Sequence, residues 1–545
     1  MGEVEEHYDW VIVGSGFGGS VSALRLSEKG YRVLVIEKGR RFEAEDFPKV
    51  NWNLPRFLWF PALNFRGIQG IAFLRHITFL YGVGVGGGSL VYANTLPVPK
   101  PEFFHIGTWA RLADWEVELQ PHYETALRML GTATNPYLHV ADRVIGEIAK
   151  DMGREDQYEP TNVAVFFGEP EKTVPDPYFD GKGPERAGCN ECGGCMIGCR
   201  FNAKNTLDKN YLYLAEQLGC TILPDTKVNA VRPRPGGGYR LEARTTRGWF
   251  RRAPRVFTAD RVVFSGGVLG TISLLLEMQE KPDGLPDLSP QLGEYVRTNS
   301  ESLICMVASK RDQDLDTGVA IGSILHTDEH SHVEPVRYSR GSGAWRMLLL
   351  PHAPGETWLR RIGRMFRDFV AHPLKTLRAL TVWDLGRYSN WLLYMRTLEG
   401  TLRFKRAHGL GRFLAPLSSL LSVGTEAPKA SLPEATDIGM RFGEKTNSVP
   451  LSAFTETLFN IPTTAHILGG ACIGATAEDG VIGLDQQVHN YPGLYVCDGA
   501  AVSANPGVNP SLTITAMTER AMSLIAAKEV TEADIVEAEE ISEHA

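Results

Sequence analysis

Four cysteines in the stretch GCNECGGCMIGCR carry the clearest metal-binding pattern of the chain. They are Cys189, Cys192, Cys195 and Cys199. Their spacing, C-x2-C-x2-C-x3-C, is typical of bacterial iron–sulfur ligand runs. Such runs usually continue with proline, whereas Arg200 and Lys204 follow here and can offset the charge of four thiolates. We expect an iron–sulfur cluster at this loop, and a zinc site or uncoordinated thiols and disulfides are the alternatives.

A second ligand-binding pattern lies near the N-terminus, where VIVGSGFGGS contains the spacing Gly-x-Gly-x-x-Gly. Gly14 permits a tight turn, Gly16 lets the backbone approach a pyrophosphate, and Gly19 allows a helix to pack on a strand. Glu37, about 20 residues further on, is placed to accept a hydrogen bond from a ribose hydroxyl. The predicted nucleotide-binding residues of this segment are Gly14, Ser15, Gly16, Phe17, Gly18, Gly19, Glu37 and Lys38.

The residues around this fingerprint predict the elements that must position it. Residues 9–13 form an apolar run that predicts a buried strand, and residues 20–29 are amphipathic enough to form the following helix. A second strand is expected over residues 31–36 and ends at Glu37. The N-terminus of the helix would offer N–H groups and partial positive charge to a phosphate. This order predicts a Rossmann-type α/β nucleotide domain.

A glycine-dense loop follows, because five of the seven residues 82–88 are glycine. Neither a packed helix nor a strand tolerates that density. We expect close approach of the backbone to a large flat ligand, with side-chain hydrogen bonds from Ser89 and Asn94, and a flexible loop is the alternative. The expected contacts are Gly84, Gly87, Gly88, Ser89 and Asn94.

Five stretches make the chain resemble the glucose-methanol-choline (GMC) oxidoreductases, within a cholesterol oxidase-like branch. In chain order they are VIVGSGFGGS, GVGGGSLVYAN, VVFSGGVLGTISLLL, TAHILGG and LYVCDGAAVSANPGVNPSLTITAMTER. The resemblance implies FAD as the cofactor. The bond to FAD is expected to be non-covalent, because no histidine or cysteine sits beside the glycine-dense loop.

The resemblance also implies an α/β fold in which a discontinuous Rossmann-type FAD-binding domain is joined to an α+β substrate-binding domain. Alternation over residues 226–264 predicts hairpin strands within the first of these. The predicted boundaries are 1–100, 200–300 and 455–530 for the FAD-binding domain, 101–199 for a cofactor-covering segment with the cysteine-rich loop, 301–454 for the substrate-binding domain, and 531–545 for an acidic tail.

The same resemblance places the catalytic chemistry near the C-terminus. His466, in TAHILGG, would take the hydroxyl proton of an alcohol while hydride leaves the carbon for flavin N5. Asn509 would hydrogen-bond the substrate oxygen or the flavin edge, and Asn509-Pro510 predicts a helix start with asparagine at the cap. The positive end of that helix dipole would point at the flavin. The remaining predicted cofactor contacts are Val228, Asp498, Gly499, Asn509 and Pro510.

One stretch departs from the family pattern. In GMC cholesterol oxidases a glutamate in a Gly-X-Glu-Thr-Trp setting assists the double-bond shift, but residues 341–345 read GSGAW and hold no acid. Glu334 is the nearest candidate catalytic carboxylate, and it also reads as a structural ion-pair partner. We therefore expect oxidation of a lipophilic, sterol-like alcohol without relying on isomerisation. Oxidation of long-chain or other alcohols, and a redox flavoprotein without turnover, are the alternatives.

The family resemblance and the expected cluster imply a small lipophilic alcohol as substrate and oxygen, a redox protein or a quinone as electron acceptor. Composition fits a large enzyme. The chain has 545 residues, 43% of them hydrophobic, and a net charge of -8 that gives no reason to expect nucleic acid. No basic and apolar leader pattern opens the sequence, so no signal peptide is expected. Eight cysteines without such a signal favour the cytoplasm. The isolated cysteines, expected in the core, are Cys220, Cys305, Cys472 and Cys497.

Between residues 357 and 400, basic and apolar residues interleave. The basic residues are Arg360, Arg361, Arg364, Arg367, Lys375 and Arg378, and the apolar ones are Leu359, Met365, Phe366, Phe369, Leu374 and Leu377. This pattern predicts a basic amphipathic helix broken at Pro373. Such a helix can lie on an anionic membrane and admit a lipid-like substrate, so peripheral membrane contact is one interpretation. An ordinary helix with a solvated face is the other.

Overall fold

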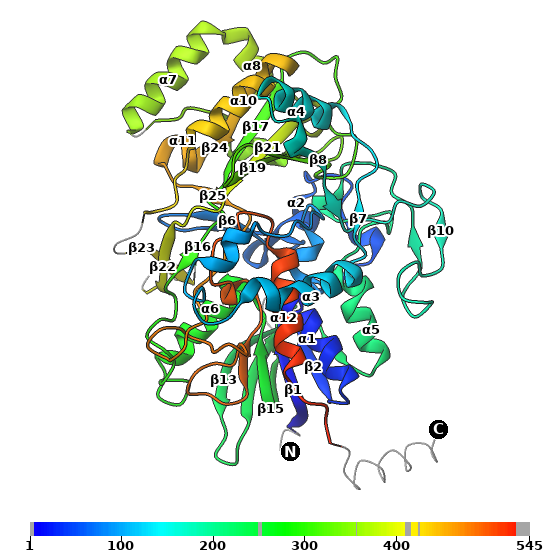
Figure 1. The fold of residues 1–545 in the computed structure, drawn as a ribbon, viewed down its shortest axis with the longest axis vertical. Coiled ribbons are helices and arrows are strands. Elements are labelled where there is room, and N and C mark those ends of the chain that lie inside the picture. The colour runs from blue at the N-terminus through cyan, green and yellow to red at the C-terminus, as the bar shows by residue number, and fades with distance from the viewer. Residues whose placement is uncertain (1–4, 249–252, 356, 409–415, 423–425, 530–545) are drawn as a thin grey trace.

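The computed structural model describes residues 5–248, 253–355, 357–408, 416–422 and 426–529. Two seven-stranded sheets dominate the molecule, one around β1 and β15 and the other around β17, β19 and β21 (Figure 1). The predicted acidic tail lies outside the described residues. Among the helices of the described part, none is both long and apolar enough to cross a bilayer.

The first sheet has the order β12-β2-β1-β15-β14-β13, with β26 paired to β15. Its strands are β1 (Glu6–Val13), β2 (Val33–Ile36), β12 (Thr221–Leu223), β13 (Thr226–Pro233), β14 (Tyr239–Thr245), β15 (Pro254–Phe264) and β26 (Leu494–Val496). The strands β12, β2, β1, β15 and β26 are parallel, whereas β13 and β14 form the predicted antiparallel hairpin with β15. All seven strands fall within the three segments predicted for the FAD-binding domain.

The strand-turn-helix at the N-terminus confirms the Rossmann prediction. β1 carries Trp10, Val11 and Ile12, which are completely buried because helices cover the sheet. α1 spans Phe17–Glu28 and thus begins three residues before the predicted helix, inside the fingerprint itself. α12 (Ser511–Ser523) packs against α1 and against α3 (Trp115–Met129), and Arg25 of α1 forms a two-pronged ion pair with Glu519 of α12 at 2.7 and 2.8 Å.

The second sheet is antiparallel and has the order β20-β24-β17-β21-β19-β18-β8. Its strands are β20 (Leu349–Pro351), β24 (Ser448–Ala453), β17 (Ser302–Ala308), β21 (Ser389–Arg396), β19 (Ser331–Val336), β18 (Ser323–His326) and β8 (Tyr158–Pro160). One face packs on α4 (Val140–Asp151) and α10 (Pro433–Thr446) through residues such as Ile304 and Leu392. The strand period of two directs the alternate residues, Leu303 and Leu393, to the opposite face. This is the expected α+β architecture, with β8 added from the segment 101–199.

Shorter elements connect the two sheets. β5 (Gln69–Phe73), β6 (Thr78–Gly82) and β25 (Thr463–Thr464) form a small sheet, as do β16 (Val296–Arg297), β22 (Thr401–Arg406) and β23 (Leu417–Leu421). The remaining helices are α2 (Leu54–Phe57), α5 (Tyr211–Gln217), α6 (Gly267–Gln279), α7 (Trp358–Ala371), α8 (Pro373–Thr381), α9 (Leu385–Tyr388) and α11 (Phe454–Phe459). The helix predicted to break at Pro373 is therefore confirmed as the pair α7 and α8.

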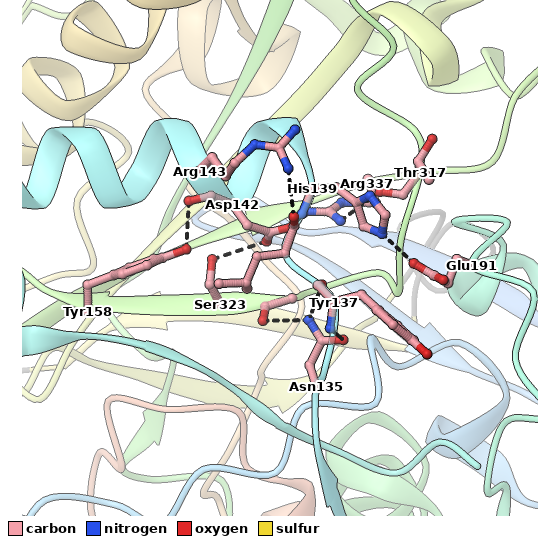
Figure 2. Close-up of polar contacts among 12 residues, drawn as sticks. Asn135, Tyr137, His139, Asp142, Arg143, Tyr158, Glu191, Thr317, Ser323 and Arg337 are labelled. Atoms are coloured by element: carbon pink, nitrogen blue, oxygen red, sulfur yellow. Dashed lines mark hydrogen bonds and ion pairs between the residues drawn. The ribbon is translucent and has the colours of Figure 1, made fainter. Parts of the chain in front are cut away.

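A buried ion pair fixes α4 to the second sheet (Figure 2). Arg337, just after β19, lies 2.8 Å from Asp142 in the first turn of α4, and both side chains are fully buried. Asp142 also accepts hydrogen bonds from the hydroxyl of Ser323 in β18 and from the backbone of His139. The His139 ring in turn contacts Glu191 of the cysteine-rich loop. This network holds the cysteine-rich loop against the second sheet.

Candidate active site

A cavity of about 970 Å³ extends from the first sheet to the second. Its two ends differ in chemistry. Next to the first sheet it is lined by Gly14, Gly16, Glu37, Lys38, Val228 and Gly267, and next to the second sheet by Ile71, Leu303, Ile321, Val336, Trp391 and Leu393. A polar, glycine-lined end suits a nucleotide, and an apolar end suits a lipophilic substrate.

The glycines at the first end of the cavity fall into two groups, those whose missing side chain makes room for other protein atoms and those that face open cavity space. A Cβ at Gly14 would lie 2.3 Å from the carbonyl oxygen of Ser265, and one at Gly19 would lie 2.1 Å from the carbonyl oxygen of Gly14. These two glycines are therefore required by the fold. A Cβ at Gly16 meets no protein atom closer than 3.9 Å and one at Gly267 meets none within 4 Å, although both line the cavity. The open space at these positions fits the pyrophosphate of FAD.

Most of the predicted cofactor contacts line this cavity. They are Gly14, Gly16, Phe17, Gly18, Glu37, Lys38, Gly87, Gly88, Val228, Asp498, Gly499, Asn509 and Pro510. The predicted residues that do not line it are Ser15, Gly19, Gly84, Ser89 and Asn94.

Ser89 and Asn94 are not among the cavity-lining residues, and their hydrogen bonds to the ligand stay a prediction. The Ser89 hydroxyl donates to the carbonyl oxygen of Gly86 and accepts from the backbone of Leu207, so it stabilises the loop. Asn94 is fully buried and lies beside Cys195. The glycine-dense loop itself is ordered: β6 ends at Gly82 and a short 3-10 turn, Gly87–Leu90, follows.

Buried charges surround the nucleotide end. Glu37 accepts hydrogen bonds from the Ser15 hydroxyl at 2.9 Å and from Gly39 N at 2.8 Å, which fix its carboxylate at the end of β2. Burial lowers the pKa of Lys38, and its ammonium lies over the ring of Tyr81. Burial raises the pKa of Asp498 to about 6, against the opposing hydrogen bond from Thr271. Asp498 follows directly after β26 and Cys497.

His466 lines the same cavity and is held by a carboxylate. Its Nδ1 lies 2.9 Å from Oε2 of Glu301, which is almost completely buried. An ionised carboxylate only accepts hydrogen bonds, so Nδ1 carries the proton and Nε2 is left to accept one. Burial alone would lower the pKa of His466, but the charge and hydrogen bond of Glu301 outweigh burial and raise it.

Asn509 also lines the cavity, and Glu334 contacts Asn509 without lining the cavity itself. The Asn509 amide nitrogen is 3.4 Å from Oε2 of Glu334, whose side chain is fully buried and whose other oxygen is 3.5 Å from the ring of His332. Glu334 is not among the cavity-lining residues, so the geometry makes it a support for Asn509. The helix start is shifted from the prediction: α12 begins at Ser511 with Pro510 at its cap, because the Asn509 side chain is directed to Glu334.

Two carboxylates near His466 escaped the sequence analysis. Glu301 stands immediately before β17 and Glu456 lies in α11, and neither belongs to a motif. Burial raises the pKa of Glu456 to about 8, and the charge of Glu301 adds to that rise. No sequence signal could have identified them, since Glu301 reaches His466, and Glu456 comes under the charge of Glu301, only through the packing of separate segments.

The cysteine-rich loop lies next to the cavity. Met196, between two of the cysteines, lines it, and the Lys204 ammonium donates to backbone oxygens of Leu90, Tyr92 and Cys195. Cys189, Cys195 and Cys199 pack around the same small core as Val163 and Val319. Within the described ranges, no group of three or more His, Cys, Asp or Glu side chains is arranged to hold a metal ion, so the geometry supports neither the expected iron–sulfur cluster nor a zinc site.

Comparison with known proteins identifies the family. A family model described as GMC oxidoreductase matches residues 422–518, and one described as an NAD(P)-binding Rossmann-like domain matches residues 12–44. The chain is 42% identical to a cholesterol oxidase of Acinetobacter baumannii over 96% of this chain and 95% of that protein. It is 46% identical to a cholesterol oxidase of Mycobacterium tuberculosis over 95% of this chain and 91% of that protein.

Solved structures share the fold at low sequence identity. Pyridoxine 4-oxidase from Mesorbium loti matches with a TM-score of 0.59 and 14% identity, over 96% of this chain and all of that one. Formate oxidase matches with a TM-score of 0.59 and 13% identity, over 96% and 98% of the two chains. With the identities to the two cholesterol oxidases and a cavity that fits FAD, the chain belongs to the GMC oxidoreductase family, in its cholesterol oxidase-like branch, as an FAD-dependent oxidoreductase acting on CH–OH donors.

Proposed function

We propose that the protein oxidises the hydroxyl group of a sterol or a similar lipophilic alcohol. The observation that carries this proposal is that His466 lines a single cavity together with the residues of the nucleotide end and those of the apolar end. Bound FAD supplies the acceptor for the hydride that leaves the alcohol carbon. The names of the two most similar relatives described above support a sterol as the donor.

Side chains of the cavity would transfer the proton, orient the substrate and exclude water. Nε2 of His466 accepts the hydroxyl proton, while Glu301 holds the ring in the required tautomer and stabilises the imidazolium that forms. The Asn509 amide, held by Glu334, orients the substrate oxygen. Apolar residues including Trp391 and Leu393 exclude water from the carbon that loses hydride.

Replacing His466 tests this assignment. We expect His466→Gln to retain FAD and to slow anaerobic reduction of the flavin by the alcohol by about 10²-fold or more, the usual scale for loss of a general base. Asn509→Ala should also slow the reaction, with FAD still bound. His489→Gln, at a half-buried histidine outside the cavity, is the control and should leave the rate unchanged. A near-normal rate in His466→Gln would move the proton acceptor elsewhere.

The electron acceptor is a separate question. The relatives named as oxidases support oxygen. Only the cysteine spacing favours a second candidate, an iron–sulfur cluster that would offer a one-electron exit to a redox protein or quinone, because the described side chains are not arranged as a metal site. Protein with iron and acid-labile sulfide, both lost in Cys192→Ser without loss of FAD, would favour this exit. Iron-free protein that forms one hydrogen peroxide per alcohol oxidised would identify an oxidase.

A further inference from the structure

One face of β19 is directed to the cavity. Val333 packs with α4 and α10 on the opposite face of the second sheet, whereas Val336 lines the cavity. Because side chains alternate along a strand, Glu334, Val336 and Tyr338 fall on the cavity face, and Tyr338 also lines the cavity. The backbone N–H of Arg337 still pairs with the neighbouring chain, so the extended conformation reaches Tyr338.

Glu334 and Tyr338 mark two levels of this face. Glu334 contacts Asn509, so its level belongs to the proposed catalytic end. Residues of a strand rise by about 3.3 Å each, so Tyr338 lies about 13 Å further along. Between the two levels, Val336 pairs with Trp391 of the neighbouring strand β21, and both line the cavity (Figure 1). An alcohol whose hydroxyl group lies beside Asn509 would therefore extend over an apolar stretch toward Tyr338.

The Tyr338 hydroxyl is a polar group among apolar neighbours. The Tyr338 ring lies 6.3 Å from the ring of Trp391 and 6.5 Å from the ring of Trp345. In the part of the chain that the structure describes, no oxygen accepts a hydrogen bond from this hydroxyl. Burial raises the pKa of Tyr338, so the hydroxyl keeps its proton and can donate it to a ligand.

A second donor lies at the same end of the cavity. Nε1 of Trp345 is buried and has no hydrogen-bond partner within the described residues, and Trp345 lines the cavity as well. The turn that carries Trp345 is fixed, because the backbone N–H groups of Gly343 and Ala344 donate to Oδ1 of Asn51 at 2.7 and 2.9 Å. Buried tyrosine and tryptophan donors usually find an acceptor. A ligand oxygen at this end would supply the acceptor that the protein lacks.

We propose that the cavity takes an alcohol that carries a second oxygen at the end remote from the reacting hydroxyl, and that the Tyr338 hydroxyl donates a hydrogen bond to this oxygen. A hydroxysteroid with a ketone on its far ring has this chemistry, whereas a sterol with a hydrocarbon tail offers no acceptor there. The assignment rests on the proposed function, because the reacting hydroxyl must lie beside His466 and Asn509. Tyr338 is then a specificity-determining residue.

Two steroids that differ only in the far oxygen test this assignment. They are dehydroepiandrosterone, with a ketone on the ring farthest from its hydroxyl, and the analogue with a methylene group in place of that ketone. We expect anaerobic flavin reduction to be half-maximal at an about tenfold lower concentration of dehydroepiandrosterone, the scale of one hydrogen bond. Tyr338→Phe should bring the two concentrations together without changing the ratio of the two maximal rates.

A matched control is Tyr137→Phe, at a tyrosine that is exposed and does not line the cavity. This variant should keep the preference of the wild type for dehydroepiandrosterone. Equal half-maximal concentrations in the wild type, or an undiminished preference in Tyr338→Phe, would overturn the proposal.

A steroid with the ketone but without the reacting hydroxyl separates this proposal from the proposed function. Its binding to the holoenzyme is measured by the change in flavin absorbance, without turnover. We expect the wild type to bind this steroid about tenfold more tightly than Tyr338→Phe does. If this difference is found but neither hydroxysteroid reduces the flavin, the proposed function fails and the recognition of the far oxygen stands. Equal binding by the two proteins would overturn the role of Tyr338.

Discussion

At the residue scale, the proposed role of His466 as proton acceptor depends on its contact with Glu301. Because Glu301 raises the pKa of His466, and only the unprotonated Nε2 accepts a proton, the rate of flavin reduction should rise with pH through that pKa. Glu301→Gln should lower the rate by about 10²-fold and shift this acidic limb to lower pH, since the supporting charge is gone. Glu301→Asp should restore part of the rate and part of the pKa shift. Both are measured by anaerobic stopped-flow reduction of the flavin across pH. A Glu301→Gln variant whose rate rises with pH at the same pKa as the wild type would contradict the proposed role of Glu301.

Substitutions at Gly16 and Gly14 should have different effects, the first on FAD binding and the second on folding. Gly16→Val should leave the thermal midpoint of the apoprotein nearly unchanged but strongly reduce its FAD content, since the added side chain points into open cavity space. Gly14→Ala should instead destabilise the apoprotein, because Gly14 has a φ of +105° and its Cβ would collide with Ser265. Full FAD occupancy in Gly16→Val would place the nucleotide elsewhere.

The sequence predicts some of the cavity residues but not the carboxylate that contacts His466. Gly14, Glu37, His466 and Asn509 sit in stretches with a recognisable order, and all four line the cavity. Glu301 could not be predicted, because its partnership with His466 spans 165 residues of chain and arises from packing.

At the scale of elements, the buried pair between Asp142 and Arg337 should be the main link from α4 to the second sheet. Arg337→Leu leaves a buried carboxylate without its charge partner, which should cost about 3–5 kcal/mol and lower the thermal midpoint. The double variant Asp142→Leu/Arg337→Leu should recover part of that loss. Arg340→Leu removes an exposed arginine that pairs with Asp314 and Asp316, and should cost about 0–1 kcal/mol. Equal shifts for Arg337→Leu and Arg340→Leu would contradict this role.

The elements themselves were partly predictable. Apolar runs and glycine spacing predict β1, α1 and β2, because local pattern and fold agree there. The addition of β8 to the second sheet was not predictable, since its three residues carry no alternation and pair with β18 from far along the chain. The cap of α12 was misplaced by one residue because a tertiary contact to Glu334 competes for the side chain of Asn509.

At the scale of the whole molecule, the two sheets form one continuous cavity and thereby bring a nucleotide end and an apolar end to the same histidine. The first sheet builds its nucleotide end from three separate stretches of sequence, and the second sheet supplies most of its apolar lining. The composition of the chain does not predict this cavity. The shape of the cavity depends on how β17, β19 and β21 of the second sheet face the first sheet.

The most direct test of the account is anaerobic mixing of the FAD-loaded protein with a sterol that carries a ring hydroxyl group. We predict that the flavin absorbance is bleached and that one equivalent of the ketosteroid forms per flavin reduced. A long-chain primary alcohol, mixed in the same way, should reduce the flavin much more slowly. A flavin that stays oxidised with the sterol but is reduced by the primary alcohol, or by neither, would contradict the central claim.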